Sequence, residues 1–309
     1  MKIVQHCLYT GPAKDSMGGE RIVESLTKGL LKLEHEVVMY VNPDSKNMPA
    51  RVVDHFPKDF DIIHSHGVNL EYSGMPWVSC VHGGGSSSRD EPWVNDSRFI
   101  CSSKFICDLF GKQDYVHTCV DESDCLFSDK KDDYFLWLAG TDWQSYNDGK
   151  GLWRTIELAK KMNFNLLIAG AGKHIQTIEK IKSFCNNKIK YIGSVNGIEK
   201  AKVISQAKAL ILLTQLPDAC PTTISEAYLS GTPVIGSVCG SLPELILHEK
   251  TGFLCKSNLD FAKAIINIDK IKPVECYEYA KKSLCSDVMA EKYVKIYEKI
   301  IKNFRKKNV

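Results

Sequence analysis

Short apolar runs alternate with amphipathic stretches along almost the whole chain. The first runs begin at Ile3, Val37 and Ile62, and two more follow at 77–81 and 99–101. Between the first two runs, apolar side chains recur at helical spacing, which predicts one amphipathic helix. Near-continuous apolar strands that alternate with helices are typical of a parallel sheet covered on both faces. The pattern therefore predicts an α/β fold with doubly wound sheets.

The alternation is interrupted between Val120 and Asp133. This stretch is rich in Asp, Ser and Lys and has no apolar period, so we predict a domain boundary there. The alternation then restarts, with strands expected at 134–139, 166–169, 189–192, 209–213 and 234–235, and helices near 152–162, 175–184 and 198–207. We assign residues 1–125 to a first Rossmann-like domain and residues 126–287 to a second.

The last segment, residues 288–309, has the pattern of an amphipathic helix. Tyr293, Tyr297, Ile300 and Phe304 fall on one face, and basic side chains occupy the rest. We expect the apolar stripe to pack back on the first domain, as in an ordinary surface helix. A basic amphipathic helix can also lie on an anionic membrane surface, so weak peripheral membrane contact is the alternative.

Composition narrows the class of protein without naming a function. The chain has 309 residues, of which 44% are hydrophobic and 25% charged, a globular balance. The formal net charge of +3 is too small to indicate a nucleic-acid partner. No apolar run approaches the ~20 residues of a membrane span, and the N-terminus lacks a signal-peptide pattern. We therefore expect a cytoplasmic protein.

Twelve cysteines are scattered along the chain, mostly within apolar segments. A chain of this length does not need a disulfide framework, so none is expected. No two of the cysteines form a C-x-x-C pair, so a zinc site is not expected either. Buried, reduced thiols are the favoured interpretation.

Two candidate ligand loops follow strands of the first domain. Gly18 and Gly19 lie between the first strand and the first helix, where backbone amides suit a phosphate, although a simple turn has the same pattern. His82 follows the strand 77–81 and precedes three glycines. There it either faces the ligand crevice of a parallel sheet or is a solvated loop histidine. His64 and His66 end another strand, and for them a structural role is favoured.

The second domain carries a lysine and two carboxylates in loops that follow strands. Lys150 can place a cation beside a phosphate, or can simply be solvated. Asp218 and Glu226 lie on one strand–loop–helix unit, and carboxylates accept bidentate hydrogen bonds from vicinal hydroxyls. Two of them can hold two sugar rings. The alternative is that Asp218 caps the helix and Glu226, two turns into it, lies on the surface.

In their order along the chain, these segments resemble the retaining glycosyltransferases of the large family four, which have the GT-B fold. The most specific signal is the pair Asp218 and Glu226, separated by seven residues and followed by Gly-Thr-Pro-Val-Ile at 231–235. The other similar segments are 18–19, 34–37, 61–67, 81–83, 167–172, 191–193, 240–246 and 250–254. The resemblance implies two Rossmann-like domains facing across a cleft, with residues 1–125 as the acceptor domain and residues 126–287 as the nucleotide-sugar donor domain. The final helix, 288–309, would cross back to the first domain.

The resemblance further implies sugar transfer from a UDP- or GDP-linked donor to a hydroxyl of a glycan, lipid-linked or other acceptor. The configuration of the sugar would be retained, and no metal or other cofactor would be needed. The residues that the resemblance places at the donor are Gly18, Gly19, Lys150, Gly193, Thr222, Thr223 and Glu226. Of these, Gly19 would offer an amide to the diphosphate, and Glu226 would hold the ribose.

Three residues are implied in catalysis. Lys150 would neutralise the diphosphate leaving group, Asp218 would hold sugar hydroxyls, and His82 would lie at the sugar near the reacting face.

The chain departs from the family pattern at three places. Asp218 stands where the family has Glu, Cys220-Pro221 replaces Phe-Gly, and Thr141 stands where an arginine usually follows Gly140. Three cationic side chains are candidates to replace that arginine at the diphosphate: Arg89, Lys173 and Arg154. Two other classes stay open: a nucleotide-sugar epimerase, which can use the same fold, and a catalytically silent partner subunit, which would fit the missing arginine.

Overall fold

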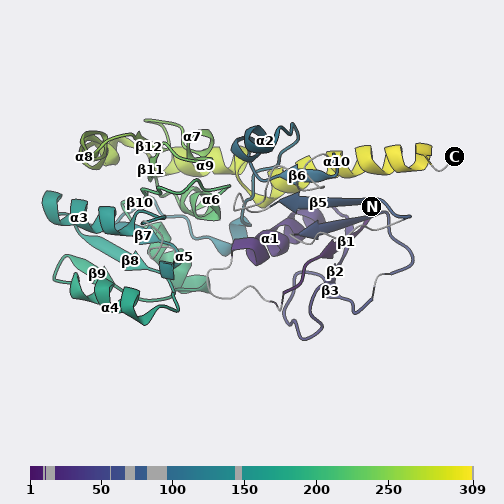
Figure 1. The fold of residues 1–309 in the computed structure, drawn as a ribbon, viewed down its shortest axis with the longest axis horizontal. Helices are drawn as coiled ribbons and strands as arrows, with labels where there is room; N and C mark the ends of the chain where they lie inside the picture. Colours follow the sequence, from purple (N-terminus) through teal and green to yellow (C-terminus); the bar gives the residue numbers. More distant parts are fainter. Residues whose placement is uncertain are drawn as a thin grey trace. The chain divides into compact units, whose positions relative to one another are not determined.

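The computed structural model of the chain describes residues 1–9, 11, 18–55, 57–66, 74–81, 96–142 and 148–307 (Figure 1). Internal contacts divide the chain into two compact units. Unit 1 comprises residues 1–121 and 284–309, and unit 2 comprises residues 122–283. The division falls inside the stretch that lacks an apolar period, and each bound lies four residues before the one expected from the sequence.

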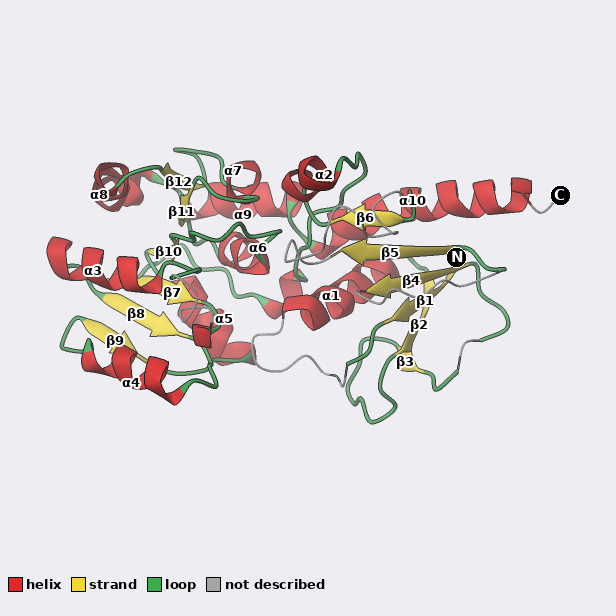
Figure 2. Ribbon diagram, viewed as in Figure 1, coloured by secondary structure: helices red, strands yellow, loops and turns green. Residues whose placement is uncertain are grey.

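Unit 1 is built on a parallel sheet whose strand order is β3-β2-β1-β4-β5-β6 (Figure 2). Its strands are β1 (Lys2–His6), β2 (Glu36–Tyr40), β3 (Arg51–Val52), β4 (Ile62–His66), β5 (Trp77–Val81) and β6 (Phe99–Cys101). Its described helices are α1 (Gly18–Lys32), α2 (Lys104–Phe110) and α10 (Ser286–Lys307). The order reverses direction between β1 and β4, which is the Rossmann arrangement.

Unit 2 repeats the same topology with a second parallel sheet, ordered β12-β11-β10-β7-β8-β9. Its strands are β7 (Phe135–Leu138), β8 (Leu166–Ala169), β9 (Ile189–Tyr191), β10 (Ala209–Leu212), β11 (Val234–Ser237) and β12 (Gly252–Cys255). Its described α-helices are α3 (Leu152–Met162), α4 (Ile175–Ser183), α5 (Gly197–Gln206), α6 (Thr222–Leu229), α7 (Leu242–Leu245), α8 (Asn258–Asn267) and α9 (Pro273–Ser283). The unit also contains the 3-10 turns η2 (Glu122–Asp124) and η4 (Ile268–Lys270). The expected doubly wound α/β fold is confirmed.

The helices of unit 2 form two layers, because the crossovers run in opposite directions on either side of the β7–β10 pair. In one layer α3 packs against the C-terminal end of α4, where the ring centroids of Trp153 and Phe184 lie 6.0 Å apart. The segment after α3 meets α8 in the same layer. In the other layer α6 packs on α5 and α9, with Tyr228 against Tyr279. All four residues of β7 and of β10 are buried, as central strands require.

The long last helix, α10, packs on α1 within unit 1, as predicted (yellow in Figure 1). The helices approach closely at Gly29, where an added Cβ would lie 2.9 Å from the Cβ of Ala290. Tyr293 and Tyr297 are buried, but the stripe then continues through Ile301 rather than Ile300. The reason is that a straight helix turns 3.6 residues per revolution, so a buried stripe drifts around it.

Two other expectations concern the membrane and the cysteines. None of the helices within the described residues is long and apolar enough to cross a bilayer. All twelve cysteines lie among the described residues as thiols, and eight of them are buried. Burial, rather than disulfide formation, is thus the common feature of these side chains.

Candidate functional site

The strand order of unit 2 reverses between β7 and β10, which pair directly as neighbours. From β7 the chain continues into the helix layer of α3, and from β10 into that of α6. In open α/β sheets, ligands bind outside the carboxyl ends of the strands at such a switch point. The loops that follow β7 and β10 are therefore the candidate site.

The loop after β7 brings Lys150 to this point through a network of backbone contacts. The carbonyl of Gly149 accepts bonds from the Thr214 hydroxyl, at 2.8 Å, and from the Gln215 amide, at 3.0 Å. Gly151 has φ +71°, and an added Cβ there would overlap the carbonyl of Leu213. Only glycine allows this approach, so the loop is fastened to the segment that follows β10.

The loop after β10 is fastened in turn by the loop after β11. The amide of Ser241 donates to the carbonyl of Asp218 at 2.9 Å. Gly240 has φ +57°, and an added Cβ would overlap the backbone of Asp218. Backbone contacts among the loops that follow three neighbouring strands of the sheet, β7, β10 and β11, thus fix the backbone position of Asp218.

Lys150 and Asp218 form an ion pair at the switch point. The Lys150 side chain is 26% exposed and that of Asp218 is 17% exposed. Both remain reachable from solvent, so the pair is not a closed structural bridge. An ammonium group and a carboxylate side by side can bind a phosphate oxygen and a sugar hydroxyl respectively.

The helix that follows Asp218, α6, carries the remaining predicted carboxylate. It begins with Thr222 and Thr223, both partly exposed, and its N-cap residue is Pro221. Asp218 is therefore not the cap. Glu226 is the fifth residue of α6, so it lies little more than one turn into the helix rather than two. Its side chain is only 2% exposed, and the surface interpretation is wrong.

Sequence reasoning missed the residue that holds Glu226. Lys200, on α5, places its Nζ 2.8 Å from Oε1 of Glu226 and is itself only 14% exposed. The signal in the sequence was weak, because Lys200 sits among the charged residues Glu199 and Lys202 on an otherwise ordinary helix. Only the packing of α5 against α6 brings this lysine to a carboxylate.

Thr141 lies where the family resemblance calls for an arginine. Its side chain is buried, and an added Cβ at Gly172 would overlap its hydroxyl. Its amide donates to the carbonyl of Ala171 at 2.8 Å. The position is therefore packed into the fold and presents no charge. Next to it, Asp142 accepts from the amides of Lys173 and His174.

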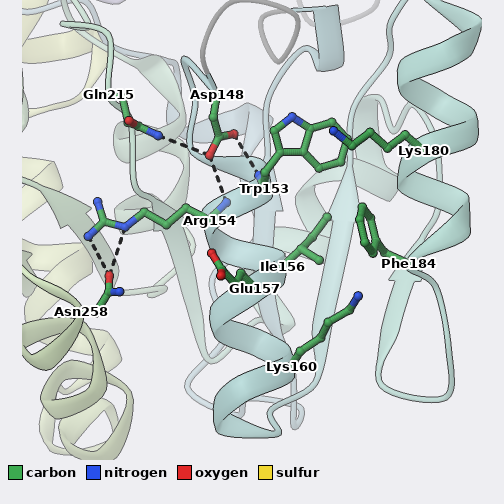
Figure 3. Close-up of a pocket in the computed structure, with 10 residues that line it drawn as sticks. All are labelled: Asp148, Trp153, Arg154, Ile156, Glu157, Lys160, Lys180, Phe184, Gln215 and Asn258. Atoms are coloured by element: carbon green, nitrogen blue, oxygen red, sulfur yellow. Dashed lines mark hydrogen bonds between the residues drawn. The ribbon is translucent and has the colours of Figure 1, made fainter.

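Arg154, a candidate replacement for the missing arginine, lies in a groove beside α3 that reaches the loops after β7 and β10 through Asp148 and Gln215 (Figure 3). Its guanidinium group donates to Asn258 at 2.9 Å, while Asp148 accepts from the amides of Trp153 and Arg154. Lys180 lies over the Trp153 ring, 4.4 Å from its centroid. The groove has a volume of about 690 Å³, but these side chains are already engaged with one another. Lys173 is exposed, and Arg89 lies outside the described residues.

The other predicted site residues are distributed over both units. Gly193 follows β9 in unit 2, has φ +76° and has open space around its Cα. Gly18 and Gly19 begin α1 in unit 1, and an added Cβ at Gly19 would meet nothing within 4 Å. His82 lies outside the described residues. Within the described ranges, no group of three or more His, Cys, Asp or Glu side chains is placed to hold a metal ion.

Comparison with known proteins finds a family model and a curated relative that are similar to parts of the chain. Residues 144–283 match the family model described as glycosyl transferases group 1. The N-acetyl-alpha-D-glucosaminyl L-malate synthase of Bacillus anthracis is 26% identical over 150 residues. That match covers 47% of this chain and 39% of the relative, so it spans well under two thirds of the relative's length.

Solved structures extend the likeness of fold to nearly the whole chain. AviGT4, a glycosyltransferase involved in avilamycin A biosynthesis, has a TM-score of 0.81 at 20% identity, covering 97% of this chain and 98% of its own. Alr3699/HepE from Anabaena, solved in complex with UDP-glucose, has a TM-score of 0.70 at 12% identity. The match covers 97% of this chain and 100% of that protein. The GT-B fold is therefore confirmed.

Proposed function

We propose that this chain, whose residues 144–283 match the family model described as glycosyl transferases group 1, transfers a sugar from a nucleoside diphosphate sugar to a hydroxyl. The observation that carries the proposal is the partly exposed pair of Lys150 and Asp218 at the switch point of unit 2. The donor is UDP- or GDP-linked, and UDP is favoured because Alr3699/HepE was solved with UDP-glucose. The acceptor is a glycan or a lipid-linked or other hydroxyl compound in the cytoplasm.

In the proposed reaction, the bond from the anomeric carbon to the diphosphate breaks as the acceptor hydroxyl attacks from the same face. The sugar keeps its configuration, the acceptor proton passes to the leaving phosphate oxygen, and charge builds up on the diphosphate. Lys150 then exchanges Asp218 for that diphosphate, and Asp218 turns to the sugar hydroxyls. Catalysis rests on positioning and on stabilisation of the leaving group. We propose that Lys150 and backbone amides suffice, without a divalent metal.

The test of the donor class is a thermal-shift screen of UDP, GDP and other nucleoside diphosphates, followed by UDP- and GDP-sugars. A ligand that binds only the native state raises the melting temperature. We expect one nucleoside diphosphate to raise it clearly, and Glu226→Ala to weaken that nucleotide by about 1.5–3 kcal/mol. A folded Glu226→Ala protein with unchanged nucleotide affinity would remove the ribose role.

His82 is proposed to touch the sugar where charge develops. His82→Ala should then lower turnover about a hundred-fold while donor affinity stays nearly intact. A loss of melting temperature in step with activity would instead mark a structural histidine. Full turnover in the variant would refute the assignment.

A catalytically silent relative is the second candidate, and Thr141 is the observation that favours it. A buried threonine at the position of the family's arginine leaves one cation fewer at the leaving group. Nucleotide release from a donor sugar, measured with and without acceptor extracts, separates the candidates. A transferase releases nucleotide faster with acceptor, an epimerase changes the sugar without acceptor, and a silent partner does neither. Addition of EDTA should not change transferase activity, and rescue by magnesium or manganese would contradict metal independence.

A further inference from the structure

Glu226 and Lys200 form an ion pair that lies almost entirely inside unit 2. The two helices that carry them, α5 and α6, pack on each other in one layer. The Nζ and Oε1 atoms are 2.8 Å apart, and the side chains are 14% and 2% exposed. This burial distinguishes the pair from the more exposed pair of Lys150 and Asp218.

A buried ion pair of this kind stabilises the packing of two helices inefficiently, because desolvation of the charges offsets much of their attraction. Removing two charges from water costs several kcal/mol per ion, and apolar residues of similar volume often stabilise a fold equally well. A role beyond stability therefore offers the better explanation for two charges at this place. The partner of Lys200 is the carboxylate already proposed to hold the ribose, on the helix that starts at the switch point.

We propose that Lys200 is a positioning residue: through its ion pair it keeps the Glu226 carboxylate oriented and charged for the ribose hydroxyls of the donor nucleotide. This inference rests on the proposed function, since it acts through the proposed ribose contact. A carboxylate has two oxygens and about four lone-pair sites, so it accepts from an ammonium and from hydroxyls together. Hydrogen bonds to an ionised acceptor are stronger than those to a neutral acid.

Removing the ammonium changes the protonation of Glu226. A carboxyl group in a buried place without its cation favours the neutral form, so its pKa rises. In Lys200→Met, the nucleotide then meets a neutral acid at low pH and a carboxylate at high pH. Titratable groups near α6 include Tyr228, with Cys276 and Tyr279 of α9 beside it, and Lys131, which donates to the carbonyl of Ser230. They are common to wild type and variant, so their effects cancel in a ratio of dissociation constants.

The experiment measures the dissociation constant of UDP, or of GDP if UDP does not bind, by calorimetry between pH 6 and pH 9. We expect Lys200→Met to weaken binding about tenfold or more near neutral pH, equivalent to about 1.4 kcal/mol. The ratio to wild type should shrink as pH rises, because Glu226 ionises. Lys200→Arg, which keeps the charge, should bind within about threefold of wild type.

Two comparisons separate positioning from direct contact and from general damage. Lys202→Met removes an exposed lysine from the same helix and should leave UDP affinity unchanged. The double variant Lys200→Met with Glu226→Gln should bind no worse than Glu226→Gln alone, because the lysine then has no carboxylate to act through. If Lys200→Met does not fold, Lys200→Gln takes its place in every comparison.

The outcomes distinguish this inference from the proposed function. Additive losses in the double variant, or a loss in Lys200→Met that does not depend on pH, would overturn the positioning role. Wild-type affinity in Lys200→Met would do the same while leaving the ribose contact standing. If Glu226→Gln and Glu226→Ala both bind UDP like wild type, the ribose contact itself is wrong, and the role of Lys200 falls with it.

Discussion

Units 1 and 2 have the same strand order but very different chemistry among their described side chains. In unit 1, His64 and His66 lie on β4, both buried, with their rings stacked at 4.0 Å. His64 Nδ1 lies 2.7 Å from the Tyr297 hydroxyl of α10, and His66 Nε2 lies 2.6 Å from Gln5 Oε1. Those polar groups are therefore partnered inside the protein, as expected for structural histidines.

In unit 2, the loops beyond β7 and β10 instead present Lys150 and Asp218, which remain partly exposed. The difference teaches that a Rossmann topology supplies a position for a ligand but not the chemistry at it. Polar side chains near the end of a strand take a structural role where another element buries them and supplies their hydrogen-bond partners. Such side chains remain accessible to a ligand where the neighbouring loops contact only the backbone of the segment that carries them.

The largest expected effect concerns the covered region of unit 1. Tyr297→Ala removes a fully buried ring and the partner of His64, and should lower the free energy of unfolding by about 3–5 kcal/mol. Urea unfolding followed by fluorescence measures this loss. UDP affinity, measured under conditions where the variant is folded, should stay unchanged. A loss below about 1 kcal/mol would mean that α10 contributes little to the core.

The next effect concerns the open region of unit 2. Lys150→Met should lower turnover about a hundred-fold or more, close to 2.7 kcal/mol of transition-state stabilisation, because the leaving group loses its cation. The melting temperature should change little, since a partly exposed ion pair stabilises a fold only weakly. Lys161→Met, which removes an exposed lysine near the end of α3, is the matched control. Equal activity of the two variants would exclude the leaving-group role.

A third effect tests whether backbone packing sets the site. Gly151→Ala combines a positive φ with overlap on Leu213, so we expect a loss of about 2–3 kcal/mol in stability together with lower turnover. Gly111→Ala in unit 1 is the control, because Gly111 has φ +67° but no atom within 4 Å of an added Cβ. It should cost only the conformational strain, about 1 kcal/mol. Equal losses at both positions would show that close packing at Gly151 is unimportant.

The smallest effect separates the hydroxyl of Tyr297 from its ring. Tyr297→Phe keeps the buried ring and removes the hydrogen bonds of its hydroxyl with His64 and Gln5, so the free energy of unfolding should fall by about 1 kcal/mol. Comparison with Tyr297→Ala in the same urea titration gives the share of the hydrogen bond. A loss as large as that of Tyr297→Ala would show that the histidine contact dominates the packing of this helix.

Much of the fold was predictable because the periodicity of hydrophobic residues depends only on nearby positions in the sequence. The strands at 77–81, 99–101 and 166–169 and the helix at 152–162 have the predicted bounds. The strands β3 and β12 were not predicted, because β3 has only two residues, one of them Arg51, and β12 begins at Gly252, a residue type that is depleted in strands. Lys150 and Asp218 were predicted as site residues, and their position in loops after strands was correct.

The sequence by itself determined the alternation of strands and helices, the two-unit organisation and the residue types that follow each strand. These depend on neighbours within a few positions along the chain, which is the range over which hydrophobic period acts. Only the tertiary structure decided which charges meet. Two ion pairs join residues far apart in the sequence: Lys150 and Asp218 are 68 positions apart, and Lys200 and Glu226 are 26 apart. Thr141 is likewise packed against Gly172, which lies in the loop after another strand. Such contacts follow from the strand order and helix packing, which no local pattern encodes.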